Sequence, residues 1–170
     1  VNIVNFVSST PYTADITWVP GGLETEWQYV YALSTVTDPS TLTPFDVATT
    51  PSTTISGLTP ASLYKVWVRA KCGETYGTFS APKTFMTACI PNVNLPWVEG
   101  FEGLTTLGSS NFPPCWSKEN GDWTSTNATS YTTPRNGSNY IRNSWSATNE
   151  YMWTPGFELT AGTSYDFSFF

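Results

Sequence analysis

Residues 58–70 constrain the fold more than any other segment, because their side chains alternate between apolar and polar over a long run. Successive side chains of a β-strand point to opposite faces of the sheet, so the pattern predicts a strand with one face in a core. The residues on the predicted core face are Tyr64, Val66, Val68 and Ala70. Trp67 and Arg69 have the opposite parity and are expected to point outward.

Shorter alternating runs occupy the preceding residues. Ala14, Ile16 and Trp18 share one parity, which places Trp18 in the predicted core. Turn signals follow one another roughly every 8–12 residues, as in a β-sandwich. Only 12% of the residues are charged, and Ser, Thr, Asn, Gly and Pro fill most of the remainder, which favours short strands joined by turns over helices. The sequence therefore predicts an all-β protein.

The segment from Leu58 resembles the fibronectin type III signature. Leu58, Pro60 and Tyr64 match the Leu-x-Pro-x-x-x-Tyr run that forms the tyrosine corner of that family, in which the hydroxyl bonds to backbone upstream. Trp18 matches the core tryptophan, and residues 80–87 match the last strand. The resemblance implies that residues 1–88 form a fibronectin type III β-sandwich.

The composition changes after Thr87. Residues 89–96 are punctuated by proline and are predicted to be a linker, and residues 97–170 a second domain. That part contains Phe101-Glu102, Pro113-Pro114-Cys115-Trp116 and Thr160-Ala161-Gly162-Thr163-Ser164-Tyr165. It resembles the opening half of the MAM-like and cleaved-adhesin jelly rolls found in secreted proteins of the Bacteroidetes. The resemblance implies a partial jelly-roll β-sandwich.

A jelly roll needs roughly eight strands, more than residues 97–170 are expected to supply. The segment 165–170 is predicted to be an apolar strand, which would leave an aggregation-prone edge if nothing paired with it. We therefore expect the polypeptide to continue past Phe170 and the activity to depend on that continuation. The chain begins with Val1, so we expect a processed product or a piece of a longer protein.

The three cysteines show no Cys-x-x-Cys spacing, and histidine is absent, which argues against common zinc and redox motifs. One disulfide and one free thiol is the simplest account of an exported chain, and three reduced cytosolic cysteines is the alternative. Cys72 ends the strand after Tyr64 and Cys89 follows the next antiparallel strand, so the two are expected at opposite ends of a hairpin. We predict a disulfide between Cys89 and Cys115, with Cys72 unpaired.

The chain offers little for catalysis. Without histidine it lacks Ser-His-Asp and Cys-His systems, and it has no phosphate-binding glycine motif. An acid and base for glycoside hydrolysis would have to come from carboxylates, which are Glu99, Glu102, Asp122 and Asp166. Their spacing indicates no such pair, and solvated surface acids are the simpler reading. The prediction is that the segment is not an enzyme.

Calcium binding suits these carboxylates better than catalysis does, since calcium takes oxygen ligands from acids and loop carbonyls. The resemblance to MAM-like domains implies Glu102 and Asp122 as ligands, with Asn120 as an accessory. Ordinary strand and turn acids are the alternative.

Exposed aromatic residues are the candidate contacts for a partner. The outward parity of Trp67 beside Arg69 suggests an indole that anchors a protein or stacks on a sugar ring. The alternative is that Trp67 covers its own sheet or packs on the neighbouring domain. Trp145 lies in a polar stretch and is predicted to line a binding loop.

The net charge of −6 repels phosphate backbones and anionic lipids, which argues against nucleic-acid binding. The sequence has no apolar run of roughly eighteen residues, so membrane insertion is not expected. We predict an extracellular or cell-surface segment that binds a protein or glycan ligand and spaces the rest of the same polypeptide. An accessory region of a secreted peptidase or glycosidase is the alternative function, and a structural repeat of a stalk is a third.

Overall fold

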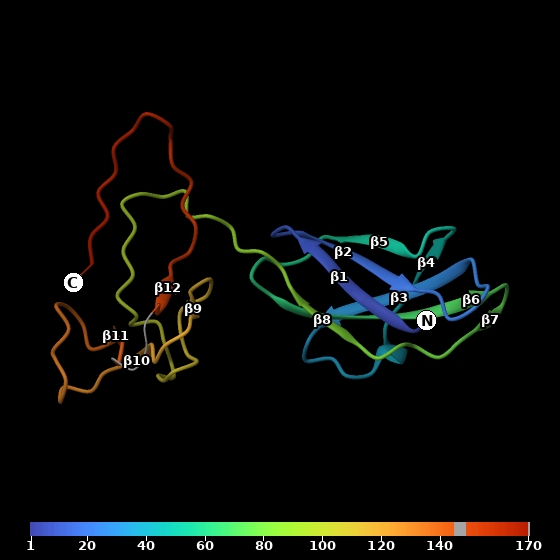
Figure 1. Cartoon of the computed structure of the whole chain (residues 1–170), viewed down its shortest axis with the longest axis horizontal. Coiled ribbons are helices and arrows are strands. Elements are labelled where there is room, and N and C mark those ends of the chain that lie inside the picture. The colour runs from blue at the N-terminus through green and yellow to red at the C-terminus, as the bar shows by residue number, and fades with distance from the viewer. Residues whose placement is uncertain (145–148, 170) are drawn as a thin grey trace. The chain divides into compact units, whose positions relative to one another are not determined.

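The computed structural model describes residues 1–144 and 149–169, and the chain divides into two compact units, Val1–Ile90 and Pro91–Phe170 (Figure 1). The division falls inside the segment predicted to be a linker. Part of that segment belongs to the second unit, because the Asn92 N–H donates to the Gly156 carbonyl and the Glu158 N–H donates to the Asn92 carbonyl.

The first unit is a sandwich of two antiparallel sheets. The smaller sheet has the order β1-β2-β5, and the larger has the order β4-β3-β6-β7, with β8 also paired to β6. The strands are β1 (Ile3–Ser9), β2 (Thr13–Val19), β3 (Glu26–Leu33), β4 (Phe45–Ala48), β5 (Ser52–Ser56), β6 (Leu63–Cys72), β7 (Thr75–Tyr76) and β8 (Lys83–Met86). A single 3₁₀ turn, η1 (Pro39–Thr41), lies between β3 and β4.

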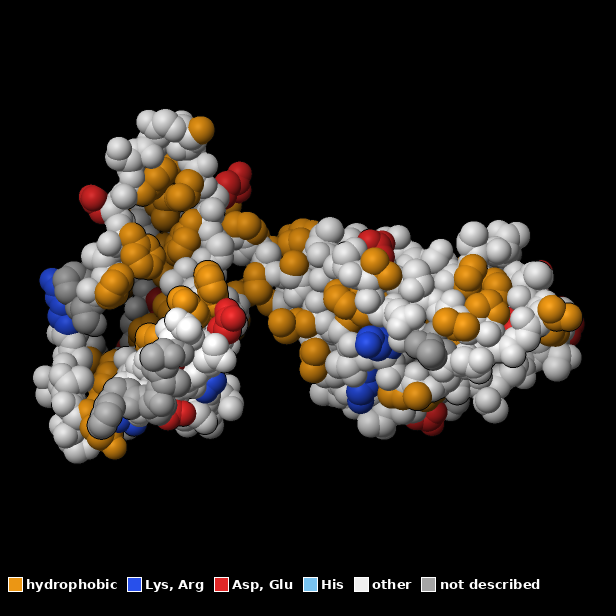
Figure 2. All heavy atoms as spheres, in the orientation of Figure 1, with side chains coloured by type: hydrophobic (Ala, Val, Ile, Leu, Met, Phe, Trp, Pro, Cys, Tyr) orange, Lys and Arg blue, Asp and Glu red, His pale blue; other side chains and the backbone are white. Residues whose placement is uncertain are grey.

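The core lies between these sheets and uses the parity that the sequence indicates. Trp18 and Trp27 meet edge to face with ring centroids 5.8 Å apart. The buried core residues are Val4, Ala14, Ile16, Trp18, Trp27, Tyr29, Ile55, Leu58, Tyr64, Val66, Val68 and Phe85. The predicted core face of residues 64–70 is confirmed. Figure 2 shows only scattered charged side chains on the visible face of this unit.

The predicted tyrosine corner is present before β6. The Thr59 N–H donates to the Tyr64 hydroxyl at 3.0 Å. Ala61 takes a left-handed conformation with φ of 51°, which turns the chain into the strand. The Thr87 hydroxyl donates to the Thr59 carbonyl at 2.7 Å, so the residue directly after β8 is hydrogen-bonded to this turn.

The chain enters and leaves the first unit at opposite ends of β1. At the entry, the Asn2 N–H donates to the Val19 carbonyl. At the exit, the Ala88 N–H donates to the Thr10 carbonyl. Strand β1 therefore spans the distance between the two ends (Figure 1).

The described part of the second unit has two short antiparallel pairs. Strand β9 (Ser117–Glu119) pairs with β12 (Tyr151–Trp153), and β10 (Thr124–Thr126) pairs with β11 (Tyr140–Arg142). The predicted strand over 165–170 differs from the structure, because residues 165–169 join no sheet there. Aromatic rings cluster instead around Trp97, whose ring lies 5.2 Å from Phe157 and 6.3 Å from Trp116.

Every regular element in the described residues is a strand except η1, which confirms the all-β prediction. Within those residues, no helix has the length and apolar character to cross a membrane.

Candidate functional site

The outer face of the larger sheet carries the sequence-predicted residues of the first unit. Three neighbouring side-chain positions of β6 on this face stand opposite three of β3, because the strands pair in antiparallel register. The facing pairs are Glu26 with Lys71, Gln28 with Arg69, and Val30 with Trp67. This face therefore combines charged, amide and aromatic groups from strands far apart in sequence.

The expectation that Trp67 is an exposed anchor is wrong. Only 3% of its surface is accessible, and its cross-strand neighbour Val30 is fully buried. Lys65, two residues earlier on the same face, donates to the Val36 carbonyl at 3.3 Å, so the connection after β3 is bonded to this face near the start of β6. Trp67 is thus packed within its own unit, in agreement with the alternative that it covers its sheet.

Arg69 is held between two aromatic rings. Its guanidinium carbon lies 4.6 Å from the ring centre of Tyr76 and 4.6 Å from that of Phe79. Its Nε and Nη2 donate to the Gln28 side-chain oxygen at 3.0 and 2.6 Å. Stacking and hydrogen bonding together fix the plane of the guanidinium.

The hydrogen bonds continue from Arg69 across the sheet. Gln28 Nε2 donates to Asp46 Oδ1 at 2.7 Å, and Lys71 Nζ pairs with Asp46 Oδ2 at 2.7 Å. We call Arg69, Gln28, Asp46 and Lys71 the polar row. It ties β6, β3 and edge strand β4 together, so it stiffens this face of the larger sheet.

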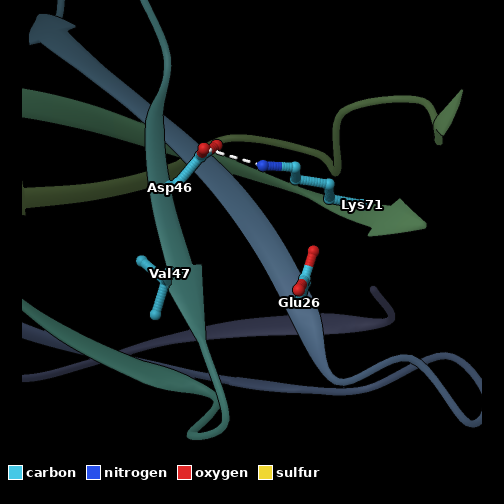
Figure 3. Close-up of a pocket in the computed structure, with 4 residues that line it drawn as sticks. All are labelled: Glu26, Asp46, Val47 and Lys71. Carbon is cyan, nitrogen blue, oxygen red and sulfur yellow. Dashed lines mark hydrogen bonds and ion pairs between the residues drawn. The ribbon is translucent and has the colours of Figure 1, made fainter. Parts of the chain in front are cut away.

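An open depression lies at one end of the polar row. Glu26, Asp46, Val47 and Lys71 line it, and Figure 3 shows Asp46 and Lys71 pointing toward one another with Glu26 beside them on β3. The hydrogen bond from Lys71, and then that from Gln28, lowers the pKa of Asp46 below its usual range. Asp46 in turn raises the pKa of Lys71. Both side chains stay charged near neutral pH.

Breaking this pair gives a prediction for the titration of Asp46. Lys71→Met is expected to raise the pKa of Asp46 toward the ordinary value of about 3.9, because the strongest donor to the carboxylate is lost. The stabilisation linked to Asp46 is complete above that ordinary value and disappears as the pH falls through the lowered pKa. Carboxyl chemical shifts followed by NMR during an acid titration measure the change.

Asp38 is the matched control, because its lowered pKa comes from Ser40 and not from Lys71. Its titration should be the same in both proteins. An Asp46 midpoint that does not move in Lys71→Met contradicts the pairing.

The smaller sheet has a second open depression around Asp15. Asp15 accepts hydrogen bonds from the Ser8 hydroxyl at 2.7 Å and the Thr54 hydroxyl at 2.8 Å. These bonds, first that from Ser8, lower its pKa. The carboxylate therefore joins β1, β2 and β5 in the way that Asp46 joins the larger sheet.

The predicted calcium ligands have other contacts in the structure. Glu102 Oε1 accepts the Ser138 N–H at 2.8 Å and the Asn139 N–H at 2.7 Å, which holds the connection between β10 and β11. The Asn120 side-chain amide donates to the Asn149 carbonyl, and the Asp122 carbonyl accepts the Thr124 hydroxyl. Across residues 1–144 and 149–169, no three His, Cys, Asp or Glu side chains form a metal-binding group. Calcium at Glu102 and Asp122 stays a prediction.

The remaining predicted residues are the cysteines and one tryptophan. Cys89 and Cys115 are disulfide-bonded, whereas Cys72, at the end of β6, is a free and exposed cysteine. Trp145 lies outside the described residues.

Comparison with known proteins identifies the first unit. Residues 1–86 match the family model of the fibronectin type III domain. No curated protein matches the chain.

Solved structures similar to the chain include the fn3 domain of the human collagen alpha-1(XX) chain, with 22% identity over 54% of this chain and 87% of that one, at a TM-score of 0.45. The FN1–FN3 domains of chicken CNTN1 share 19% identity over 51% of this chain and 29% of that one, at a TM-score of 0.44. A computationally redesigned β-sandwich protein shares 26% identity over 52% and 93%, at a TM-score of 0.43.

Proposed function

Because the chain belongs to the fibronectin type III domain family through residues 1–86, we propose that it is a non-catalytic adhesion, ligand-binding and spacer segment of a larger surface or secreted protein. Domains of this family are generally non-catalytic and commonly act as protein-interaction modules. The family match is the observation that carries the proposal.

Two further features support it. The disulfide-bonded Cys89 and Cys115 favour an oxidising, extracellular location, where disulfides persist. The tyrosine corner is a scaffold feature, which holds strands together and leaves outward-facing groups for recognition. The proposed partners are a protein or glycan ligand at the cell surface and the remainder of the same polypeptide.

We place the ligand contact on the outer face around Arg69. Arginine and tyrosine are enriched among the residues that dominate binding energy, and here the arginine is already ordered by its neighbours. Tyr76 retains 42% exposure beside the guanidinium, so this pair offers an aromatic and cationic surface. Either a carboxylate-bearing protein segment or a sugar ring suits that surface.

The test is an adhesion assay on immobilised cell-surface proteins and glycans, run beside an assay for hydrolysis of peptides and glycans. Arg69→Gln is expected to weaken adhesion about tenfold, the equivalent of about 1.4 kcal/mol. Lys83→Gln is the matched control, since it removes one positive charge from the same unit on β8. It should bind as the unaltered chain does.

Three outcomes of these assays would contradict part of the proposal. Equal adhesion of Arg69→Gln and the unaltered chain contradicts the placement of the contact. If neither the chain nor the intact protein adheres, the ligand-binding role is contradicted and only the spacer role remains. Turnover of a peptide or glycan by the chain contradicts the non-catalytic proposal.

A further inference from the structure

A turn in the second unit repeats the geometry of the turn that precedes β6. The first runs from Leu58 to Tyr64 and the other from Leu159 to Tyr165. Each begins with a Leu-Thr pair and ends at a tyrosine six residues after the leucine. Between those ends the sequences differ, so similarity of composition alone does not explain a shared geometry.

The same hydrogen bond closes both turns. The Thr59 N–H donates to the Tyr64 hydroxyl at 3.0 Å, and the Thr160 N–H donates to the Tyr165 hydroxyl at 2.9 Å. In each case the donor lies five residues before the tyrosine. The bond from Thr160 also lowers the pKa of Tyr165.

Both turns also place a left-handed residue three positions before the tyrosine. That residue is Ala61 in the first turn, with φ of 51°, and Gly162 in the second, with φ of 79°. Both backbones therefore make the same left-handed step at the same distance from the tyrosine, through an alanine in the first turn and a glycine in the second.

In the first unit this turn positions a strand. Tyr64 is the second residue of β6, which pairs with β3 on one side and with β7 and β8 on the other. The tyrosine ring stacks on Phe85 of β8 at 5.8 Å. The hydroxyl bond therefore fixes where the strand starts and which of its side chains face the core.

The residues after the second turn carry the same alternation. Tyr165, Phe167 and Phe169 share one parity and are 41%, 67% and 84% exposed, whereas Asp166 and Ser168 have the other parity. The rings of Phe167 and Phe169 meet edge to face at 5.9 Å. Hydrophobic side chains come to the surface in this unit (Figure 2).

We propose that residues 159–165 form a second tyrosine corner, which fixes the start of the segment 165–169 and holds its aromatic side chains on one face. This conformational device goes beyond the binding and spacer role. It makes Tyr165 a positioning residue whose hydroxyl, rather than its ring alone, orders the turn.

Amide hydrogen exchange followed by NMR tests the hydroxyl directly. In Tyr165→Phe the Thr160 amide is expected to exchange at least about fivefold faster, because one hydrogen bond of about 1 kcal/mol is lost. Tyr64→Phe should do the same to the Thr59 amide. Tyr151→Phe is the matched control, an exposed tyrosine of the same unit that should leave Thr160 unchanged.

A second variant tests the backbone path while it keeps the hydroxyl. A Cβ at Gly162 would meet no atom within 4 Å, so Gly162→Val acts through the left-handed backbone, which a β-branched residue rarely adopts although the alanine at position 61 does. It should also speed exchange at Thr160. The proposal is overturned if Thr160 exchanges at an unprotected rate in the unaltered chain, or if neither variant changes its rate.

Discussion

Replacing Trp67 with alanine is expected to lower the free energy of unfolding of the first unit by about 3–5 kcal/mol, as for other large aromatic side chains removed from packed sites. The side chain is 3% exposed although it lies on the face away from the main core. Alanine would leave a cavity against the buried Val30. Denaturant unfolding followed by circular dichroism measures the loss.

Leu23→Ala is the control for this change. Leu23 is fully exposed in the same unit, and its replacement should alter the unfolding free energy by less than about 0.5 kcal/mol. If Trp67→Ala were as mild as Leu23→Ala, the burial of Trp67 would be contradicted.

Loss of the disulfide has the next largest expected effect. Cys89 and Cys115 are both disulfide-bonded, and for cysteines roughly 25 residues apart in sequence the expected cost of removing the bond is about 2–4 kcal/mol. Most of that cost arises because the unfolded chain gains conformational freedom. Thermal unfolding of Cys89→Ser, compared with the unaltered oxidised chain, measures it.

Cys72→Ser is the matched control, because Cys72 is free and exposed. It should unfold at the same temperature as the unaltered chain and respond equally to a reducing agent. A larger effect of Cys72→Ser than of Cys89→Ser would indicate that the wrong cysteine was taken as unpaired.

Parity in the sequence predicts which face of a strand a residue takes, but not what covers that face. It places Tyr64, Val66 and Val68 correctly in the core. It also places Trp67 correctly on the other face, yet the prediction of exposure is wrong, because Trp67 is buried there. Burial on that face depends on which groups pack over it, and periodicity does not encode that.

The polar row escaped the sequence analysis for a related reason. Gln28 and Arg69 are 41 residues apart, and Gln28 and Asp46 are 18 apart, so only the register of β3 with its neighbours brings them together. The one signal of the polar row in the sequence is the presence of opposite charges on an edge strand and a central strand that lie side by side. That signal becomes usable only once the strand pairing is known.

In the second unit, Glu102 has a contact that no local motif reveals. Its carboxylate accepts hydrogen bonds from backbone N–H groups of a turn more than thirty residues later, while calcium binding at Glu102 stays a prediction. Only a long-range contact brings the carboxylate to that turn. In contrast, the turn closed by Tyr165 is local, which is why its motif is visible in the sequence before any strand pairing is known.

The placement of entry and exit at opposite ends of β1 has a mechanical consequence. When the polypeptide is stretched, the pull on Val1 and the pull on Ala88 act in opposite directions along the strand axes. The ladder between β1 and β2 is then loaded in shear, so its hydrogen bonds resist together instead of unzipping one at a time. Tension applied between Val1 and Ala88 would therefore be carried along the β1–β2 ladder.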